Sequence, residues 1–337
     1  MLSWAFHRWE HTLANRTNDR VVRPFEWGRD WLSSHHTNLP EADADALDVY
    51  AARALADSEQ FFDATPTSSY HLDATGHLTF ESQIATPHHE NNVVHARLYR
   101  AEGERQRRAV LVLPQWNADA GGHVGLARLF ARFGITALRL SLPYHDWRMP
   151  PELHRADYIV SSNVGRTLEV CRQAVLDARR AIAWLASQGY TSIGICGTSL
   201  GSCLAMLTAA HEPLVKAAAL NHISPFFADV VWEGLSTRHV RAGLEGQIDL
   251  ERLRRIWLPI SPHPYLERVR DMHTLLVYAR YDTTFPVHLS TMLVDEFRRR
   301  GLPHTLKVLP CGHYSTGSTP FKYLDGYWLT RFLTRAL

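Results

Sequence analysis

Short runs of apolar residues recur along most of this chain. From about residue 109 onward, runs that are almost wholly apolar occupy residues 109–113, 135–140, 191–196, 217–220, 274–278 and 306–309. Such runs are typical of strands that are buried on both faces, as in a parallel sheet covered by helices. Residues 77–85 and 92–99 are also rich in β-branched and aromatic residues, and they predict a further pair of strands.

Between the apolar runs, apolar residues recur every three or four positions. This spacing predicts helices over residues 123–133, 166–187, 199–211, 286–300 and 321–337. The alternation of strand and helix predicts an α/β fold, in which a mostly parallel central sheet carries helices on both faces and the crossovers are right-handed.

Two segments depart from the alternation. Residues 1–75 favour helices and loops, so we expect an N-terminal helical extension, followed by a catalytic domain over residues 76–337. Residues 226–271 contain no convincing strand but include an amphipathic helix over residues 250–257. An interruption of this kind predicts a cap inserted over one end of the sheet, at about residues 225–271.

Composition narrows the classes of protein to which the chain can belong. The 337 residues are 45% hydrophobic and 21% charged, with a formal net charge of +2, as in an ordinary globular protein. So small a charge provides no long-range field for nucleic acid. No apolar stretch approaches the ~20 residues of a membrane helix, so we expect no membrane span. The four cysteines lack metal-ligand spacing and predict free thiols in a cytoplasmic protein.

A nucleophile motif follows one of the predicted strands. Residues 197–201 are Gly-Thr-Ser-Leu-Gly, which matches Gly-x-Ser-x-Gly, and they lie between the strand 191–196 and the helix 199–211. A sharp turn from strand to helix holds a serine hydroxyl out at the end of the sheet, near the positive end of the helix. The motif therefore predicts that Ser199 is a nucleophile.

A serine hydroxyl needs a base and an acid that orients the base. Asp282 follows the strand 274–278, and His313 follows the strand 306–309, so both lie at the strand ends where such groups belong. No acid follows the strand 217–220, where Asn221 and His222 stand, so no residue there competes with Asp282. We therefore predict a Ser199–His313–Asp282 triad.

The oxyanion of the reaction needs two backbone N–H donors. Leu200, directly after the nucleophile, supplies the first. The second is expected from the loop after the strand 109–113, where Pro114 has no N–H. We favour Trp116 as this donor, with Gln115 as its competitor. Gln115 is also expected to bind the substrate. His145 and Arg148 follow the strand 135–140, and we expect them to line the substrate pocket.

From about residue 77 to the C-terminus the chain resembles the α/β-hydrolase superfamily. The elbow, the order of acid and histidine, and the strand ends all match that pattern. The chain differs in its oxyanion loop, where many members have His-Gly and this chain has Pro114-Gln115. The resemblance implies hydrolysis of an ester, thioester or amide without a cofactor or metal. It does not identify the substrate, because the fold hosts many functions.

Several alternatives stay open. The same triad could transfer an acyl group to an alcohol or amine instead of water. His7, Glu10 and His11 match the His-x-x-Glu-His zinc motif, which would make a metallopeptidase. A non-catalytic binding protein would need a broken triad. We expect a small molecule with an acyl group of small to medium size as the substrate. It should be neutral, because the charges of the cap are balanced. A homodimer is also left open by the sequence. Trp232 of the cap is expected to influence acyl-chain preference.

Overall fold

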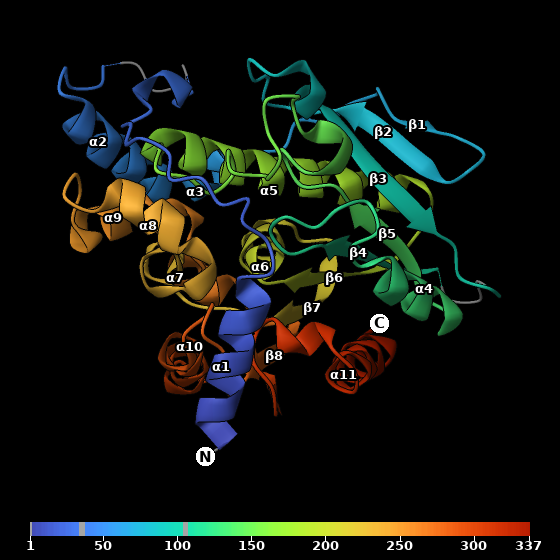
Figure 1. Cartoon of the computed structure of the whole chain (residues 1–337). Helices are drawn as coiled ribbons and strands as arrows, with labels where there is room; N and C mark the ends of the chain where they lie inside the picture. Colours follow the sequence, from blue (N-terminus) through green and yellow to red (C-terminus); the bar gives the residue numbers. More distant parts are fainter. Residues whose placement is uncertain (1, 34–37, 104–106) are drawn as a thin grey trace.

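A computed structural model describes residues 2–33, 38–103 and 107–337. Across these residues a nine-stranded mixed sheet has the order β1-β2-β3-β5-β4-β6-β7-β8-β9 (Figure 1). The strands are β1 His71–Leu72, β2 His77–Glu81, β3 Val93–Tyr99, β4 Arg108–Leu113, β5 Thr136–Leu140, β6 Ser192–Thr198, β7 Val215–Asn221, β8 His273–Ala279 and β9 Thr305–Leu309. From β5 to β9 in this order every neighbouring pair is parallel.

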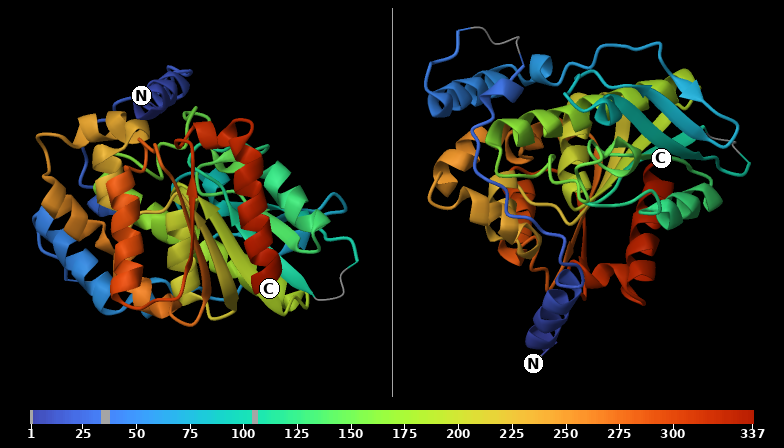
Figure 2. Two further views of the ribbon diagram at one scale, coloured as in Figure 1. Left: turned by 90° about the horizontal axis from the view of Figure 1, so that it is seen from below. Right: turned by 45° about the horizontal axis from the view of Figure 1, so that its top comes forward.

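Helices cover both faces of the sheet (Figure 2). The buried side chains of α5 (Val164–Ser187), α6 (Leu200–His211) and α10 (Val287–Arg299) pack on one face. Those of α4 (Val124–Arg132) and α11 (Phe321–Ala336) pack on the other. Because the central strands are buried on both faces, their sequences are apolar throughout, and the predicted α/β fold is confirmed.

The edge of the sheet differs in detail from the prediction. The expected strand 77–85 ends at Glu81, and residues 82–92 form a loop that includes the 3₁₀ turn His89–Asn92. Polar side chains explain the loop, because Asn92 accepts hydrogen bonds through Oδ1 from the Thr86 backbone N–H (2.7 Å) and hydroxyl (2.9 Å). The short strand β1 was not predicted, since two residues carry no periodic pattern.

The N-terminal segment contains α1 (Leu2–Ala14), α2 (Asp43–Ala56) and α3 (Ser58–Phe61). Leu47, Tyr50 and Ala54 of α2 are buried in the main apolar core. The segment also contributes β1, which pairs with β2. The division of the chain near residue 75 therefore stays a prediction.

The segment between β7 and β8 is helical among the described residues, as predicted. It consists of α7 (Phe227–Glu233), α8 (Arg238–Leu244) and α9 (Leu250–Ile256), joined by 3₁₀ turns. Trp257 is fully buried there, and its indole N–H donates to the carbonyl of Val164 at 3.0 Å. This bond holds the insertion against α5.

None of the described helices combines the length and apolar character needed to cross a membrane. The four cysteines are free and buried, which agrees with the expectation of unpaired thiols. Burial raises the pKa of Cys203 to about 12, so this thiol, which lies on α6 beside the candidate site, stays protonated near neutral pH.

Candidate active site

Ser199 lies in a strained turn between β6 and α6. Its φ of 57° and ψ of −122° are unusual for a residue with a side chain. The turn depends on two glycines: a Cβ on Gly197 would lie 2.1 Å from the carbonyl oxygen of Gly201, and one on Gly201 would lie 2.3 Å from that of Leu113. The backbone N–H of Ser199 donates to the carbonyl of Asn221 at 2.8 Å, which fixes the elbow to β7.

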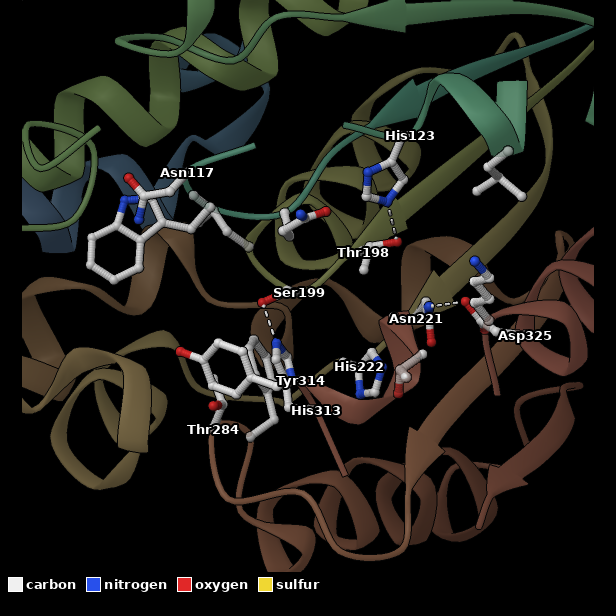
Figure 3. Close-up of a pocket in the computed structure, with 18 of the residues that line it drawn as sticks. Asn117, His123, Thr198, Ser199, Asn221, His222, Thr284, His313, Tyr314 and Asp325 are labelled. Carbon is white, nitrogen blue, oxygen red and sulfur yellow. Dashed lines mark hydrogen bonds between the residues drawn. The ribbon is translucent and has the colours of Figure 1, made fainter. Parts of the chain in front are cut away.

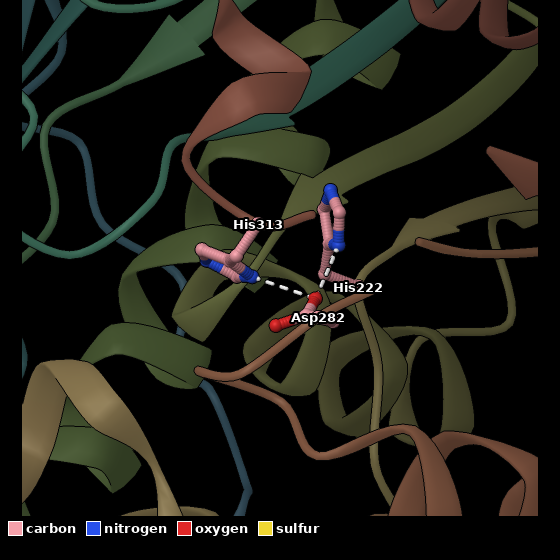
Figure 4. A group of neighbouring side chains, drawn as sticks. All are labelled: His222, Asp282 and His313. Carbon is pink, nitrogen blue, oxygen red and sulfur yellow. Dashed lines mark hydrogen bonds and ion pairs between the residues drawn. The ribbon is translucent and has the colours of Figure 1, made fainter. Parts of the chain in front are cut away.

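The three residues predicted to form a triad are joined by hydrogen bonds through His313. His313 Nε2 is 3.1 Å from Ser199 Oγ, and His313 Nδ1 is 2.9 Å from Asp282 Oδ2 (Figures 3 and 4). The second oxygen of Asp282 accepts hydrogen bonds from the backbone N–H groups of Thr284 (2.8 Å) and Phe285 (2.7 Å). The carboxylate is thereby held in one orientation, which orients the imidazole in turn.

A second histidine shares the carboxylate. His222 Nδ1 is also 2.9 Å from Asp282 Oδ2, and the rings of His222 and His313 lie 4.5 Å apart (Figure 4). His222 directly follows β7, and its N–H donates to the carbonyl of Val277 in β8 at 2.8 Å. The sequence analysis considered residues 221 and 222 only as a place where no acid stands. His222 could have been found as a candidate site residue because it follows β7, the strand that pairs with the strand before Ser199.

Burial and charge separate the two histidines. Burial alone would lower the pKa of His313, but attraction to Asp282 outweighs it, and the pKa is raised. Burial and the nearby His313 lower the pKa of His222. Burial opposes ionisation of Asp282 too, yet attraction to His313 and the hydrogen bonds from both histidines hold its pKa well below the usual range. At neutral pH His222 is therefore neutral and Asp282 is ionised.

His222, Asp282 and His313 are also the one group among the described residues whose donor atoms lie close enough together, within 4.8 Å, to hold a metal ion. Both imidazole Nδ1 atoms lie at hydrogen-bonding distance from the same carboxylate oxygen. With Nδ1–H directed at Asp282, His313 presents an unprotonated Nε2 to Ser199. The geometry thus fits a hydrogen-bonded base.

The expected oxyanion loop follows β4 and faces the nucleophile. Gln115, Trp116 and Asn117 line the same cavity as Ser199 and Leu200. The N–H of Asn117 donates to His145 Nε2 at 3.0 Å. Among the hydrogen bonds of the described residues, none uses the backbone N–H of Gln115, Trp116 or Leu200. These three groups are therefore free to bind an oxyanion.

The structure corrects the expectation that His145 and Arg148 line the pocket. Both are fully buried. His145 supports the oxyanion loop: its Nδ1–H donates to Pro143 O at 2.9 Å, and burial lowers its pKa to about 4, so Nε2 can accept from Asn117. Arg148 pairs with Asp177 at 2.9 Å. A sequence position after a strand does not distinguish a pocket residue from a residue that holds the loop.

The cavity at Ser199 has a volume of about 1400 Å³. Residues of the inserted segment form part of its wall, among them Phe227, Val230 and Val231. Trp232 does not belong to that wall; the guanidinium of Arg241 stacks over it at 5.4 Å. The insertion thus contributes residues on both sides of Trp232 to the cavity at Ser199, but not Trp232 itself.

The zinc-like motif in α1 has another role. His7 and His11 are exposed, whereas Glu10 is fully buried. The carboxylate of Glu10 accepts hydrogen bonds from the backbone N–H groups of Tyr314 (2.7 Å) and Ser315 (2.9 Å). Glu10 therefore holds the loop that carries His313, and no group that could bind a metal includes His7 or His11 among the residues described.

Comparisons with known proteins agree with this architecture. A family model described as alpha/beta hydrolase domain containing 18 matches residues 90–241, which include the elbow but neither Asp282 nor His313. No curated protein matches the chain by sequence.

Solved structures with the same fold include two acetyl xylan esterases and a peptidase. Acetyl xylan esterase 1 from Thermoanaerobacterium sp. JW/SL YS485 has 15% identity and a TM-score of 0.61, over 88% of this chain and 95% of that one. The enzyme from Paenibacillus sp. R4 has 16% identity and a TM-score of 0.61, over 94% and 100%.

Acylaminoacyl peptidase from Pyrococcus horikoshii has 16% identity and a TM-score of 0.60 over 83% of this chain. The chain spans 43% of the length of that peptidase. The similarities confirm the fold expected from the sequence, the α/β-hydrolase fold.

Proposed function

This chain has the α/β-hydrolase fold, and we propose that it is a serine hydrolase that cleaves a carboxylic ester through an acyl-enzyme on Ser199. The observation that carries the proposal is the continuous hydrogen-bonded series from Ser199 Oγ through His313 to Asp282, with separations of 3.1 and 2.9 Å. A thioester or an amide would be attacked by the same groups.

In the proposed reaction His313 takes the proton of Ser199 as the oxygen attacks the substrate carbonyl. The imidazolium that forms is stabilised by Asp282, and its proton then passes to the leaving alcohol. Water, activated by the same histidine, attacks the acyl-enzyme and releases the acid. The raised pKa of His313 makes it a stronger base than an isolated histidine.

The negative oxygen of the intermediate is expected to bind the N–H of Leu200 and that of Trp116 or Gln115. Two hydrogen bonds hold the loop that follows β4. The backbone N–H of Asn117 donates to His145, and the indole N–H of Trp116 donates to the carbonyl of Ala156 at 2.8 Å. Each such donor contributes about 3 kcal/mol to the stability of the transition state. These two hydrogen bonds restrain the loop that carries the proposed donors.

The apolar wall supports an acyl chain rather than a charged group next to Ser199. Phe227 and Val231 are 5% and 2% exposed, and the ring of Phe285 stacks on that of His313 at 5.4 Å. Burial of a methylene group contributes about 0.8 kcal/mol. We therefore propose an acyl group of small to medium size.

The proposal is tested by labelling the protein with a fluorophosphonate and locating the adduct by mass spectrometry. The adduct is expected on Ser199, and Ser199→Ala should lose both the label and the hydrolysis of p-nitrophenyl acetate. Ser236→Ala is the matched control, since Ser236 lines the same cavity but belongs to the inserted segment. An adduct on another serine would refute the assignment. Repeating the assay with added alcohol separates hydrolysis from acyl transfer, through the ratio of acid to new ester.

A further inference from the structure

Beside the triad, the cavity contains polar side-chain atoms that are buried and have no hydrogen-bond partner. Seven of them come from residues that line this one cavity: Arg20 Nε, His123 Nδ1, Arg155 Nε, Asn221 Oδ1, His222 Nε2, Asp325 Oδ1 and Thr330 Oγ1. In Figure 3 His123, Asn221, His222 and Asp325 lie on one side of Ser199 and His313. We call Asn221, His222, Asp325 and Thr330 the polar floor.

The polar floor follows from strand alternation. Cys196 of β6 and Ala217 and Ala219 of β7 pack against α4 and α11. Side chains two residues further along a strand point to the same face, so Asn221 faces these two helices at the end of β7. Asp325 approaches from α11, and Asn221 Nδ2 donates to its Oδ2 at 3.0 Å.

Unpartnered polar atoms are costly in a protein interior. A buried group that lacks its hydrogen bond costs about 1–3 kcal/mol, so several at one place are rarely found without a bound molecule. Asn221 and His222 are each only 1% exposed, and Thr330 is 5% exposed. Burial raises the pKa of Asp325 to about 7, opposed only by the hydrogen bond from Asn221.

The free atoms set the chemistry of the ligand. Asn221 Oδ1 accepts only, and so does His222 Nε2, because neutral His222 has its proton on Nδ1 toward Asp282. Asp325 Oδ1 accepts when ionised. The part of a ligand that lies on the polar floor must therefore donate several hydrogen bonds; Arg20 Nε and Arg155 Nε, which can only donate, belong to the cavity lining outside the floor.

The charge of the cavity decides between the two common donors, hydroxyl groups and ammonium groups. Five cationic side chains line it: Arg20, Arg155, Lys322, Arg331 and Arg335. Asp325 is the one carboxylate among the lining residues that the structure describes. An ammonium group would be repelled by this surplus of positive charge, whereas hydroxyl groups can donate without charge.

We propose that the polar floor binds the hydroxyl groups of a polyhydroxylated alcohol, so that the substrate of this enzyme is an ester of a polyol. The inference rests on the proposed hydrolase function. The alcohol part is assigned to the floor because the leaving oxygen must reach His313 to take its proton, and the ring of His222 lies 4.5 Å from that of His313. The acyl part then occupies the apolar wall at Phe227 and Val231.

The test compares 2,3-dihydroxypropyl acetate with propyl acetate, which differ only in two hydroxyl groups. The wild-type enzyme should prefer the diol ester by about tenfold or more in kcat/KM, because propyl acetate leaves the buried acceptors unpaired. The double variant Asn221→Leu/Asp325→Leu removes both members of a hydrogen-bonded pair, and Thr330→Val removes one hydroxyl group. In the double variant the preference should fall to near one, and in Thr330→Val it should fall severalfold. Thr291→Val on α10, outside the cavity, should keep it.

A binding measurement separates this proposal from the proposed function. Saturation-transfer NMR on Ser199→Ala should show tighter binding of the diol ester than of propyl acetate, and the Asn221→Leu/Asp325→Leu changes should abolish the difference. Circular dichroism confirms that each variant is folded. If only water fills the polar floor, the Ser199→Ala protein should bind the two esters equally. Equal binding, together with hydrolysis of p-nitrophenyl acetate by the wild-type protein, would refute the polyol site but not the hydrolase function. If the binding preference is found and no ester is hydrolysed, the hydrolase function is refuted alone.

Discussion

Glu10, near the start of the chain, accepts a hydrogen bond of 2.7 Å from the backbone N–H of Tyr314, the residue after the catalytic histidine of the proposed triad. The same carboxylate accepts from Ser315 at 2.9 Å. Gly312 permits this approach, because a Cβ there would lie 2.3 Å from the carboxyl carbon of Glu10. Helix α1 therefore contributes to the position of His313 without entering the reaction.

Glu10→Ala should weaken both the fold and the reaction. Two buried N–H groups lose their acceptor, and each such loss costs about 1–3 kcal/mol. We expect a lower Tm and a kcat reduced about tenfold, since His313 is less well oriented. Gly312→Ala should have a similar effect without altering Glu10. The control is Glu59→Ala at an exposed position, and wild-type kinetics in both Glu10→Ala and Gly312→Ala would contradict this role.

The rate should depend on the protonation of His313. Burial acts to lower its pKa, but Asp282 raises it above the ordinary value of 6.5, and only the neutral imidazole can accept a proton. As pH rises through this raised pKa the neutral fraction grows, so kcat/KM for p-nitrophenyl acetate should increase along a limb with its midpoint above pH 6.5. A flat profile between pH 5 and 9 would exclude His313 as the base.

Asp282→Asn should leave the fold intact and reduce kcat by about 10³–10⁴-fold. The amide cannot stabilise the imidazolium, and it presents a different hydrogen-bonding pattern to His313. Since the attraction that raises the pKa of His313 is lost, any residual activity should show its limb at lower pH than the wild type. Full activity with unchanged circular dichroism would mean that another acid orients the base.

His222 is expected to position Asp282 rather than to exchange protons with the substrate. His222→Phe removes one hydrogen bond to Asp282 Oδ2, and that oxygen then interacts more strongly with His313. We predict that kcat falls about tenfold and that the limb moves to higher pH, in the direction opposite to Asp282→Asn. A role in packing alone would lower Tm without moving the limb.

The acyl-chain preference should depend on the cavity wall. Phe227→Ala and Val231→Ala enlarge the pocket. The kcat/KM for p-nitrophenyl esters of longer acids should therefore rise relative to that for the acetate, by about tenfold for each 1.4 kcal/mol gained by burying the longer chain. Trp232→Ala is the matched control, because Trp232 lies outside the cavity wall and packs under Arg241. A shift of preference in Trp232→Ala equal to that in Phe227→Ala would show that the wall is assigned wrongly.

A metal chelator should leave the activity unchanged. The three donor atoms of His222, Asp282 and His313 lie close enough to hold an ion, but their separations are those of hydrogen bonds. Activity of the purified protein toward p-nitrophenyl acetate is measured with and without EDTA and with added zinc. Loss with EDTA and recovery with zinc would replace the serine mechanism by a metal-dependent one.

The sequence by itself determined the parallel strands of the central sheet, the helices that alternate with them, and the strand ends at which Ser199, Asp282 and His313 stand. These features are local: a strand buried on both faces is apolar throughout, and a Gly-x-Ser-x-Gly turn needs its glycines within five residues. The common direction of parallel strands then brings their ends to one edge of the sheet. The location of a site at that edge could therefore be predicted without coordinates.

Only the tertiary structure decided which side chains surround that edge. Glu10 and Tyr314 are 304 residues apart, and His222 and Asp282 are 60 apart, so no periodicity in the sequence connects them. The sequence could not show that Arg148 is buried against Asp177 instead of facing the substrate, because loop positions after a strand are polar in either case. Which polar groups bind one another depends on packing between distant segments, and that packing also left the acceptors of Asn221 and His222 free.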